Sequence, residues 1–505
     1  MELLSVLVLA IVAIASALVL RIIYNLYFHP LARFPGPWYA ASFSLSGAIV
    51  SLLRREPEWM MGLAKKYGAG DNPIRISPNL LLFPRSSTLK DIYCKAQLNT
   101  KGPLYGTGVL GPPHLFSTLD GNEHRILRKA LGGPQWSFGV LKNVWEPRID
   151  GLIELFSKRM MEFSERGETV DISDKVAQFA ADVMTMVSFS EPWGFVKNSR
   201  DERHLLESWR DGLNLFGFAG RFRWFRDTIL KSPLLAPHIL PKMSDASGMG
   251  YLIAQADEQV ARREKLIDEQ GFTQDKPDFL QYALEARIQS QPLSPVQKRA
   301  HITLLIQAGA DTTGTALGST LRFLLTHPSC LARVRSEIAA AEAAGRLSSP
   351  VQYEETRAYL PYFVACIKES MRLNPPATNL FSRLVPEGGA RVGGVFVPEG
   401  TEITTQAWVV MRDPELYAPD PEAYRPERWL ESEEKTAEFE SCSFVFGMGP
   451  RVCLGKDIAV MELYKLLPEI LRRFDMELVS EGRPIVAGGV MYNSGLTVRL
   501  SGRKA

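Results

Sequence analysis

The stretch Phe446–Gly455, FGMGPRVCLG, decides the fold that this sequence predicts. It is a glycine-rich loop holding Cys453, one of five cysteines in 505 residues, and the KDIAVMELYKLL that follows has helical apolar spacing. A helix N-terminus offers a positive dipole end and free backbone N–H groups, and both stabilise a thiolate. Cys453 alone would indicate a buried structural cysteine, but the loop as a whole predicts a thiolate that binds a metal.

The other residues of the loop suit a flat cofactor beside the cysteine. Gly447 and Gly449 allow tight turns, and Gly455 lets the following helix approach closely. Phe446 can shield the sulfur from water, and Arg451 is placed to pair with a carboxylate of the cofactor. The pattern F-x-x-G-x-R-x-C-x-G fixes five of ten positions, so a chance match is rare.

The composition argues against several other classes of protein. Hydrophobic residues make up 46% and charged residues 23%, as in an ordinary globular protein. A net charge of +2 gives no support to a nucleic-acid partner. The odd number of scattered cysteines, without a C-x-x-C pair, argues against a disulfide framework and a zinc site, and it fits a reducing compartment.

The N-terminus predicts a membrane anchor. Residues 3–20 carry no charge, and as a helix they span about 27 Å, close to the thickness of the hydrocarbon core. A cleaved signal peptide is the alternative, because Ala15-Ser16-Ala17 offers a cleavage site, but the apolar run is long and no basic residue precedes it. Arg21 and Arg33 follow the run, so the positive-inside rule leaves the bulk of the chain in the cytosol.

One large domain is expected after this anchor. We assign residues 1–27 to the anchor, 28–37 to a stiff Pro/Gly linker and 38–505 to the catalytic domain. The spacing predicts long helices over residues 146–166, 171–189, 294–328 and 360–376. Residues 382–410 instead contain short β-branched runs between glycine turns, so the fold class is mainly α with a minor β region.

These motifs, in this order along the chain, resemble those of the cytochrome P450 superfamily. The resemblance implies the cytochrome P450 fold, a helical heme-binding domain with a small β-rich subdomain behind an N-terminal transmembrane helix. It identifies Cys453 as the axial thiolate ligand to the heme iron. The segment HPLARFPGP and the region after Gly455 are similar to membrane-anchored fungal members of the pisatin demethylase type, which mostly tailor secondary metabolites or detoxify plant compounds.

The resemblance also implies roles for residues of two further motifs. In QAGADTTGT, Ala308 and Gly309 would open space for dioxygen, while Asp311 and Thr312 would relay protons to it from solvent. Without the cysteine loop, the same glycine would be a tolerated flaw in a core helix. Three further residues are expected to form a buried ion network of structural rather than catalytic role, namely Glu369, Arg372 and Arg428. Trp429 stands where the family usually has phenylalanine.

Four residues are implied as ligands of the heme propionates. They are His124, Arg128, Arg383 and Arg451. The family often has tryptophan where this chain has His124, and a histidine can still donate one N–H group. A solvated basic helix is the alternative for the stretch that holds His124 and Arg128.

The implied function is a heme-thiolate monooxygenase that inserts one oxygen atom of O2 into a hydrophobic small molecule. Its cofactor would be heme b, with electrons from NADPH through NADPH–cytochrome P450 reductase and cytochrome b5 as a further donor. The alternatives are a heme-thiolate isomerase or dehydratase, a detoxifying demethylase of plant compounds, a peroxygenase and a heme sensor. Hydroxylation, epoxidation, demethylation and desaturation stay open. The expected location is the endoplasmic reticulum membrane, single-pass, with the catalytic domain cytosolic.

Three expectations concern the surface and the substrate. Arg125, Lys129 and Lys456 would attract an acidic electron donor, unless they are scattered surface charges. Residues 215–230 mix aromatic residues with arginines, which predicts a lid at the membrane interface, with a helix end packed on the body as the alternative. The polar groups expected in a largely apolar pocket are those of Thr378, Asn379, Tyr492 and Asn493.

Overall fold

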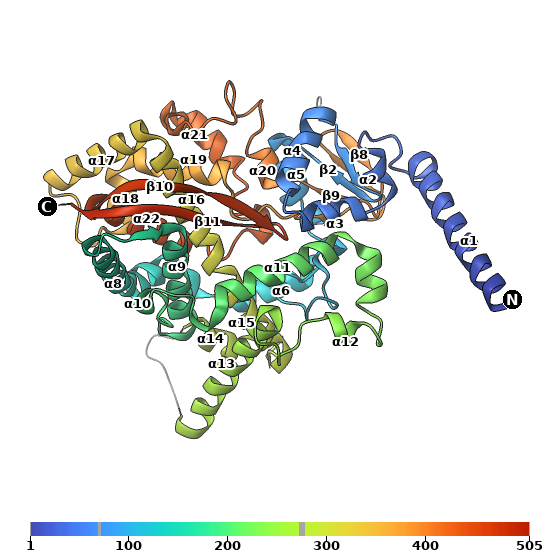
Figure 1. Ribbon diagram of the computed structural model, residues 1–505, viewed down its shortest axis with the longest axis horizontal. Coiled ribbons are helices and arrows are strands. Elements are labelled where there is room, and N and C mark those ends of the chain that lie inside the picture. The colour runs from blue at the N-terminus through green and yellow to red at the C-terminus, as the bar shows by residue number, and fades with distance from the viewer. Residues whose placement is uncertain (1, 69–71, 272–277, 504–505) are drawn as a thin grey trace.

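The structure is a computed structural model that describes residues 2–68, 72–271 and 278–503. Helices form most of the molecule; β2, β8 and β9 lie at the end from which the N-terminal helix projects, and the long strands β10 and β11 lie in the other half (Figure 1). The helices are α1 (Glu2–Ile23), α2 (Trp38–Ser42), α3 (Leu45–Leu52), α4 (Glu56–Tyr67), α5 (Leu89–Tyr93), α6 (Gly121–Leu131), α7 (Phe138–Val140), α8 (Glu146–Glu165), α9 (Ile172–Phe189), α10 (Phe195–Asn198), α11 (Leu205–Arg221), α12 (Ala236–Ile239), α13 (Gly248–Gln270), α14 (Phe279–Glu285), α15 (Pro295–Ala308), α16 (Ala310–Thr326), α17 (Pro328–Ala343), α18 (Tyr353–Tyr359), α19 (Pro361–Leu373), α20 (Ala407–Val410), α21 (Glu433–Ser441) and α22 (Lys456–Arg473).

The strands form two main sheets and two isolated pairs. One sheet has the order β1-β2-β9-β6, a second has the order β10-β11-β3, and the pairs are β4 with β5 and β7 with β8. The strands are β1 (Ile74–Ser77), β2 (Leu80–Leu82), β3 (Thr169–Asp171), β4 (Arg287–Ile288), β5 (Gln291–Pro292), β6 (Arg383–Leu384), β7 (Ala390–Val392), β8 (Val395–Val397), β9 (Glu402–Thr404), β10 (Phe474–Ala487) and β11 (Val490–Gly502). The mainly α class with a minor β region is confirmed, and strands β6 to β9 lie in the predicted stretch 382–410.

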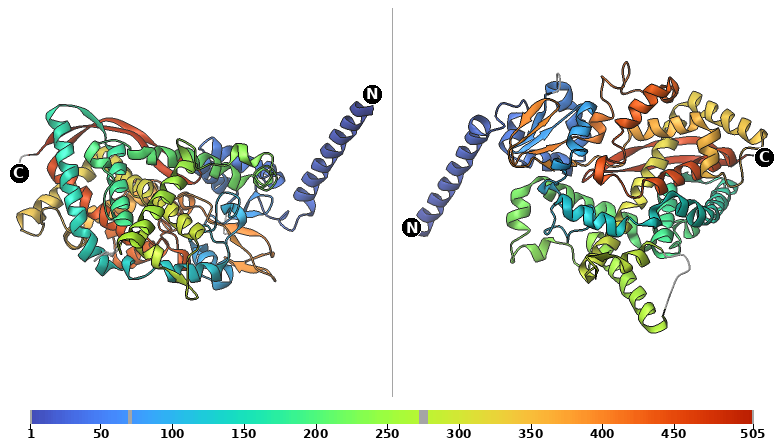
Figure 2. Two further views of the ribbon diagram at one scale, coloured as in Figure 1. Left: turned by 90° about the horizontal axis from the view of Figure 1, so that it is seen from below. Right: turned by 180° about the vertical axis from the view of Figure 1, so that it is seen from behind.

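Helix α1 projects away from the body in every view (Figures 1 and 2). The helical segment Leu4–Phe28 is long and apolar enough to cross a membrane, and none of its most apolar window is buried against the rest of the chain. Helical structure continues to Phe28, one residue beyond the predicted anchor. The expected linker is docked on the body, because Leu31 is buried and the backbone N–H of Arg75 donates to the carbonyl of Pro35 over 2.7 Å.

The main core lies where α8, α9, α16, α19 and α22 pack together with the β10–β11 hairpin. Helices α9 and α16 approach closely at Gly314, where a Cβ atom would lie 2.6 Å from the Cα atom of Ala177. The helix predicted over residues 294–328 begins as expected, with the Ser294 side chain capping α15. It is nevertheless two helices, because α15 ends at Ala308 and α16 begins at Ala310.

A buried ion network fixes α19 to the segment after α20. The Glu369 carboxylate accepts two hydrogen bonds from the Arg372 guanidinium, both of 2.8 Å, and one of 3.0 Å from Arg428 Nε. Trp429 Nε1 donates to Glu369 Oε2 over 2.9 Å, so the unusual tryptophan supplies a bond that phenylalanine cannot make. Burial acts to raise the pKa of Glu369, but the two guanidinium groups and the backbone N–H of Arg425 bring it below its usual value.

Removing the shared carboxylate should destabilise the fold strongly. The Glu369→Ala variant leaves the Arg372 guanidinium buried without a counter-charge and leaves Arg428 with only Asp420, 3.3 Å away, so its free energy of unfolding should fall by about 3–5 kcal/mol. Trp429→Phe is the control, because it removes one hydrogen bond and should cost about 1–2 kcal/mol. Denaturant unfolding measures both, and equal losses in the two variants would contradict the network.

Candidate functional site

One cavity of about 370 Å³ brings most of the predicted site residues together. The cysteine loop forms one wall, and α15 and α16 contribute another. The predicted residues that line it are His124, Arg128, Ala308, Gly309, Thr312, Arg383, Phe446, Arg451, Cys453 and Gly455. Asp311 and Gly449 are not among the described residues that line the cavity.

Two glycines give the cysteine loop its shape. Gly447 and Gly449 have φ angles of 71° and 68°, in the left-handed region that other residues rarely adopt. A Cβ atom at Gly449 would also lie 2.2 Å from the carbonyl oxygen of Tyr93. The loop closes with a 2.9 Å hydrogen bond from the Cys453 N–H to the Phe446 carbonyl, and α22 begins three residues after the cysteine. Cys453 is thus held at the cavity wall, near the N-terminus of α22.

Desolvation works against ionisation of the Cys453 sulfur. It raises the pKa of the Cys453 thiol, although the backbone N–H of Gly455 and the charge of Arg128 act in the opposite direction. A metal cation at the sulfur would favour the ionised form, since coordination deprotonates a thiol.

Positive charge gathers along the same cavity. Burial lowers the pKa of His124 to about 3, and the charges of Arg451, Lys101, Arg128 and Arg383 act in the same direction. The Nδ1 atom of His124 and the Nε atom of Arg383 are buried without a hydrogen-bond partner in the described chain.

The cavity offers these cations no anion of its own. Glu462 is the only acidic residue that lines the cavity within the described ranges. Burial raises the pKa of Glu462 well above its usual value, which disfavours the charged form of its carboxyl group. A heme fits this arrangement, because it places an iron ion at the sulfur and two carboxylates among the cations.

Arg451 and Arg128 already make bonds within the chain. The Arg451 guanidinium donates to the carbonyls of Thr118, Leu119 and Asp120 and to Asn99, over 2.8–3.2 Å. It thereby ties the segment before α6 to the cysteine loop. Arg128 donates to the Val452 carbonyl over 2.7 Å. Pairing of either residue with a carboxylate stays a prediction, and for Arg451 it would require sharing of donors that are already used.

The break between α15 and α16 lies at Gly309. The Gly309 N–H reaches the Leu305 carbonyl over a long 3.4 Å, and the Thr312 hydroxyl donates to the Ala308 carbonyl over 2.7 Å. A Cβ atom at Gly309 would lie 2.5 Å from the side chain of Met184, which also lines the cavity. Glycine is therefore required here because Met184 packs closely against it, while the expected space for dioxygen stays a prediction.

Asp311 points away from the cavity to an unforeseen partner. The Arg210 guanidinium of α11 donates three hydrogen bonds of 2.8–3.2 Å to the carboxylate of Asp311, which is 1% exposed. Arg210 also lies 3.7 Å from Asp174 and 4.7 Å above the ring of Tyr492. An open path from Asp311 to solvent was expected, but an ion pair occupies this carboxylate because α11 crosses it. A local sequence pattern contains no signal for a partner 101 residues away.

The segment 215–230 was expected to face a membrane, but its arginines Arg221 and Arg226 point towards the body of the protein. Arg221 is buried and donates to both carboxylate oxygens of Glu56, and Arg226 donates to the Pro103 carbonyl. These arginines fasten α11 and the following turn to the body instead of facing a membrane. Trp224 is exposed, so the aromatic part of the segment remains accessible.

The polar groups expected in the pocket instead form hydrogen bonds with other parts of the chain. Asn493 donates to the Thr315 carbonyl, Asn379 accepts from Arg221, and the Tyr492 hydroxyl accepts from Arg54. None of these three residues, nor Thr378, is among the described residues lining the cavity. The lining is largely apolar, and the sequence did not single out several of its members, namely Lys101, Val183, Met184, Phe279, Tyr282, His301 and Glu462.

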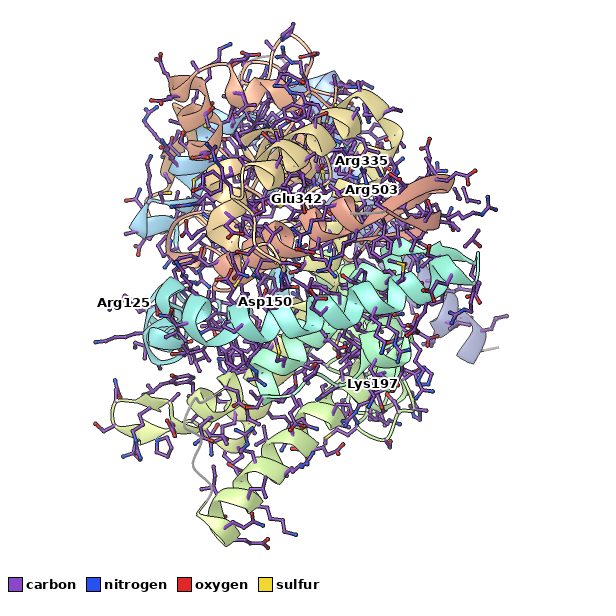
Figure 3. All side chains as sticks on the ribbon, turned by 90° about the vertical axis from the view of Figure 1, so that its left-hand side faces the viewer. Arg125, Asp150, Lys197, Arg335, Glu342 and Arg503 are labelled. Atoms are coloured by element: carbon purple, nitrogen blue, oxygen red, sulfur yellow. The ribbon has the colours of Figure 1, made fainter. Side chains whose placement is uncertain are left out.

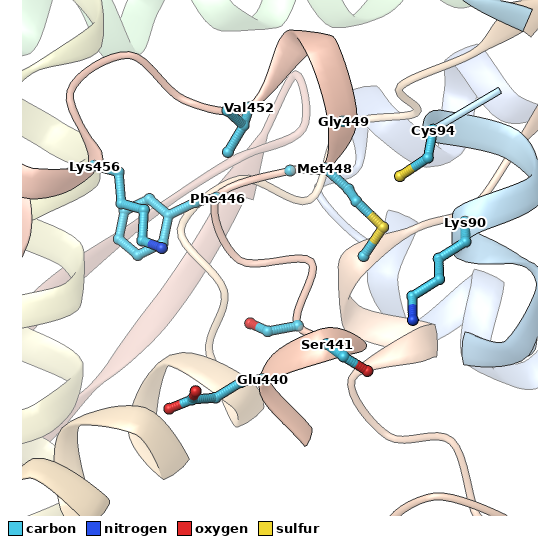
Figure 4. A pocket seen from close by; sticks show the side chains of 11 residues that line it. Lys90, Cys94, Glu440, Ser441, Phe446, Met448, Gly449, Val452 and Lys456 are labelled. Carbon is cyan, nitrogen blue, oxygen red and sulfur yellow. The ribbon is translucent and has the colours of Figure 1, made fainter. Parts of the chain in front are cut away.

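A second pocket, of about 470 Å³, opens on the outer side of the cysteine loop. Figure 4 shows Lys90 of α5 and Cys94, which directly follows α5, on one side of it, with Met448 and Phe446 on the other. Phe446, Gly447, Met448 and Val452 line both this pocket and the cavity. The cysteine loop is therefore the only layer of chain at these positions between the cavity and the outer surface.

Comparison with known proteins supports one family. The Cytochrome P450 family model matches residues 106–491. A protein described as a cytochrome P450 monooxygenase from Aspergillus terreus is 30% identical over 88% of this chain and 90% of its own length. Quiannulatic acid synthase from Emericella variicolor is 30% identical over 89% of this chain and 88% of its own length. Cytochrome P450 monooxygenase gsfF from Penicillium aethiopicum is 28% identical and both chains are covered completely.

Loss of the Arg210 charge should loosen α11. In Arg210→Met the Asp311 carboxylate stays buried without its partner, so the free energy of unfolding should fall by about 3–5 kcal/mol and amide exchange in α11 should accelerate. Asp174→Asn is the matched control, since this half-exposed partner should contribute less than about 1 kcal/mol. Unchanged exchange in α11 of the Arg210 variant would show that the ion pair does not hold the helix.

Proposed function

The chain belongs to the cytochrome P450 family and is a monooxygenase, and from this premise we propose that it oxidises a hydrophobic small molecule in fungal secondary metabolism. The observation that carries the proposal is the single cavity that joins Cys453, the cation cluster and the break at Gly309. Apolar residues from several helices surround the rest of this cavity, which suits an uncharged substrate of moderate size.

Heme, when bound, supplies the activation of dioxygen that such oxidations need. Cys453 would provide the thiolate that holds the iron, and Phe446 would limit access of water to the sulfur. The N–H group of Gly455 and the Arg128 charge would favour its ionised form. His124, Arg128, Arg383 and Arg451 would hold the propionates, with Arg451 acting mainly through the segment that it fastens.

Thr312 is the residue best placed to handle protons. Its hydroxyl group lines the cavity and donates to the Ala308 carbonyl, so it can turn to donate to a group inside the cavity. Asp311 would supply protons to this site only when its carboxylate separates from Arg210. Proton delivery therefore depends on a movement of α11 relative to α16 in this proposal.

Electrons would enter from the outer side of the cysteine loop. Lys90 and Lys456 line the outer pocket there (Figure 4), and Arg125 reaches outward from the α6 side of the molecule (Figure 3). Basic side chains at the shortest path to the heme would attract an acidic redox partner. We propose NADPH–cytochrome P450 reductase as this partner, with cytochrome b5 as a further electron donor.

The proposed location is the endoplasmic reticulum membrane, with α1 as a single-pass anchor and the catalytic domain in the cytosol. Large apolar side chains are exposed on α3 and in the segment between α11 and α13, including Leu52, Leu53, Trp224, Leu234 and Leu235. These side chains would rest in the lipid headgroup region near the anchor.

Deletion of the gene in its host tests the proposed reaction. A mass comparison of small-molecule extracts should show a lost product and an accumulated precursor one oxygen atom lighter for hydroxylation or epoxidation. A difference of two hydrogens or of a methyl group would indicate desaturation or demethylation by the same oxidant. A precursor with the same mass as the product would contradict the proposal and favour a heme-thiolate isomerase.

The role of Thr312 can be tested by the coupling of electrons to product. Thr312→Ala should retain heme but release hydrogen peroxide, and product per NADPH should fall at least about tenfold. Thr320→Ala is a matched control, because the Thr320 hydroxyl makes the same bond to the carbonyl four residues earlier but is not among the described cavity residues. Equal coupling in both variants would remove Thr312 from the proton path.

A further inference from the structure

His301 is the polar residue on the cavity-facing side of α15. It is 4% exposed, and it lines the cavity together with Leu304, Leu305 and Ala308 of the same helix. Residues three and four apart share one face of a helix, so His301 and these apolar residues face the cavity together. A buried polar ring on such a face needs partners for both of its nitrogen atoms.

The hydrogen bonds of His301 define its tautomer. Its Nδ1 atom lies 2.7 Å from the carbonyl oxygen of Gln297, and its Nε2 atom lies 3.2 Å from the backbone nitrogen of Leu115. A carbonyl only accepts and a backbone N–H only donates, so Nδ1 carries the proton and Nε2 accepts from Leu115. Burial lowers the pKa of His301, which favours this neutral ring, although the bond to Gln297 acts in the opposite direction. The ring thus joins α15 to a residue 186 positions earlier in the chain.

The segment that contains Leu115 has few other attachments. Residues 107–117 form no helix or strand, and beyond bonds to their immediate neighbours only two hydrogen bonds join them to the rest of the described chain. Leu115 donates one of these to His301, and the Phe116 carbonyl accepts the other from Lys101. The bond to His301 is therefore a main attachment of this segment to the helical body.

The position of Leu115 decides where Phe116 lies on the cavity wall. The Leu115 side chain packs into a small apolar cluster beside α6. The next ring along the chain, that of Phe116, lies 5.3 Å from the ring of Tyr105 and 6.5 Å from that of Phe381. All four residues line the cavity. A shift of Leu115 away from α15 would move Phe116 with it and change the cavity at this wall.

We propose that His301 is a positioning residue for the substrate: by accepting from Leu115 it holds residues 107–117 as a wall of the cavity, with Phe116 against the bound molecule. The inference rests on the proposed monooxygenase function and names a contact within the protein that determines specificity. A wall that is ordered before binding favours a large apolar molecule, because no binding free energy is used to order it. Without the acceptor, large molecules should bind more weakly, whereas small ones do not reach this wall.

The test uses two probes of different size on the full-length holoprotein. Imidazole and 4-phenylimidazole bind a ferric heme through nitrogen, and both shift its Soret band. His301→Phe keeps a ring but has no acceptor, so 4-phenylimidazole should bind about 3- to 10-fold more weakly, as expected for one lost neutral hydrogen bond. Imidazole affinity should be unchanged. His301→Gln should match the wild type for both probes, because its side-chain oxygen can accept from Leu115.

Amide hydrogen exchange of residues 107–117 gives a second measurement that needs no ligand. Exchange should be at least about threefold faster in His301→Phe than in the wild type, and it should stay near the wild-type rate in His301→Gln. Thr303→Val is the matched control. Thr303 is buried on the same helix, its hydroxyl donates to the Arg299 carbonyl, and it is not among the described residues that line the cavity.

The proposal requires both changes in His301→Phe. An unchanged affinity for 4-phenylimidazole, or an unchanged exchange rate in residues 107–117, would overturn it. Equal changes in His301→Gln and His301→Phe would overturn it as well, since packing of the ring would then explain the effect. A wild type whose absorbance shows no heme would instead refute the proposed function, and the exchange rates would still decide whether His301 holds the wall.

Discussion

A sulfur atom held against a cavity that contains cations but no anion is the constraint on which the rest of this structure depends. The chain places Cys453 at the wall of that cavity, yet burial works against ionisation of its thiol. On the same cavity lie Lys101, Arg128, Arg383 and Arg451, and burial raises the pKa of Glu462, the one lining carboxyl group that the structure describes. A single cofactor with an iron centre and two carboxylates meets both needs. The iron stabilises the thiolate, and the carboxylates pair with the cations. The surrounding fold supports this site and keeps the cysteine and the cations in their relative positions.

That support has four parts that act on different sides of the cavity. The Glu369 network fixes α19, and Arg451 fastens the segment before α6 to the cysteine loop. On the opposite wall, Gly309 lies at the break between α15 and α16, while Arg210 ties α11 to Asp311. The first two parts are hydrogen-bonded within the chain and suit a rigid frame. The ion pair joins α11 to α16, the helix that carries the residues of the expected proton path.

Local patterns predicted several of the long helices and most of the candidate site residues that line the cavity, because a glycine loop or an apolar period is recognised within a few residues. They did not predict the division of the helix at Gly309, where the side chain of Met184 on α9 leaves no room for a Cβ atom. The long β10–β11 hairpin was also missed, although Gly488-Gly489 between two alternating runs is a hairpin signal. The partners of Asp311 and Arg451, and the place of Lys101, depend on residues far away in the chain. Such contacts follow from the fold and leave no trace in a motif.

The most direct test of the central claim is the carbon monoxide difference spectrum of the reduced full-length protein, compared with that of Cys453→Ser. The account predicts that the wild type shows the band diagnostic of thiolate-ligated heme. The serine variant should lose this band while its helical content, measured by circular dichroism, is preserved. A wild-type protein without the thiolate band, or a serine variant that keeps it, would show that Cys453 does not ligate a heme in this cavity.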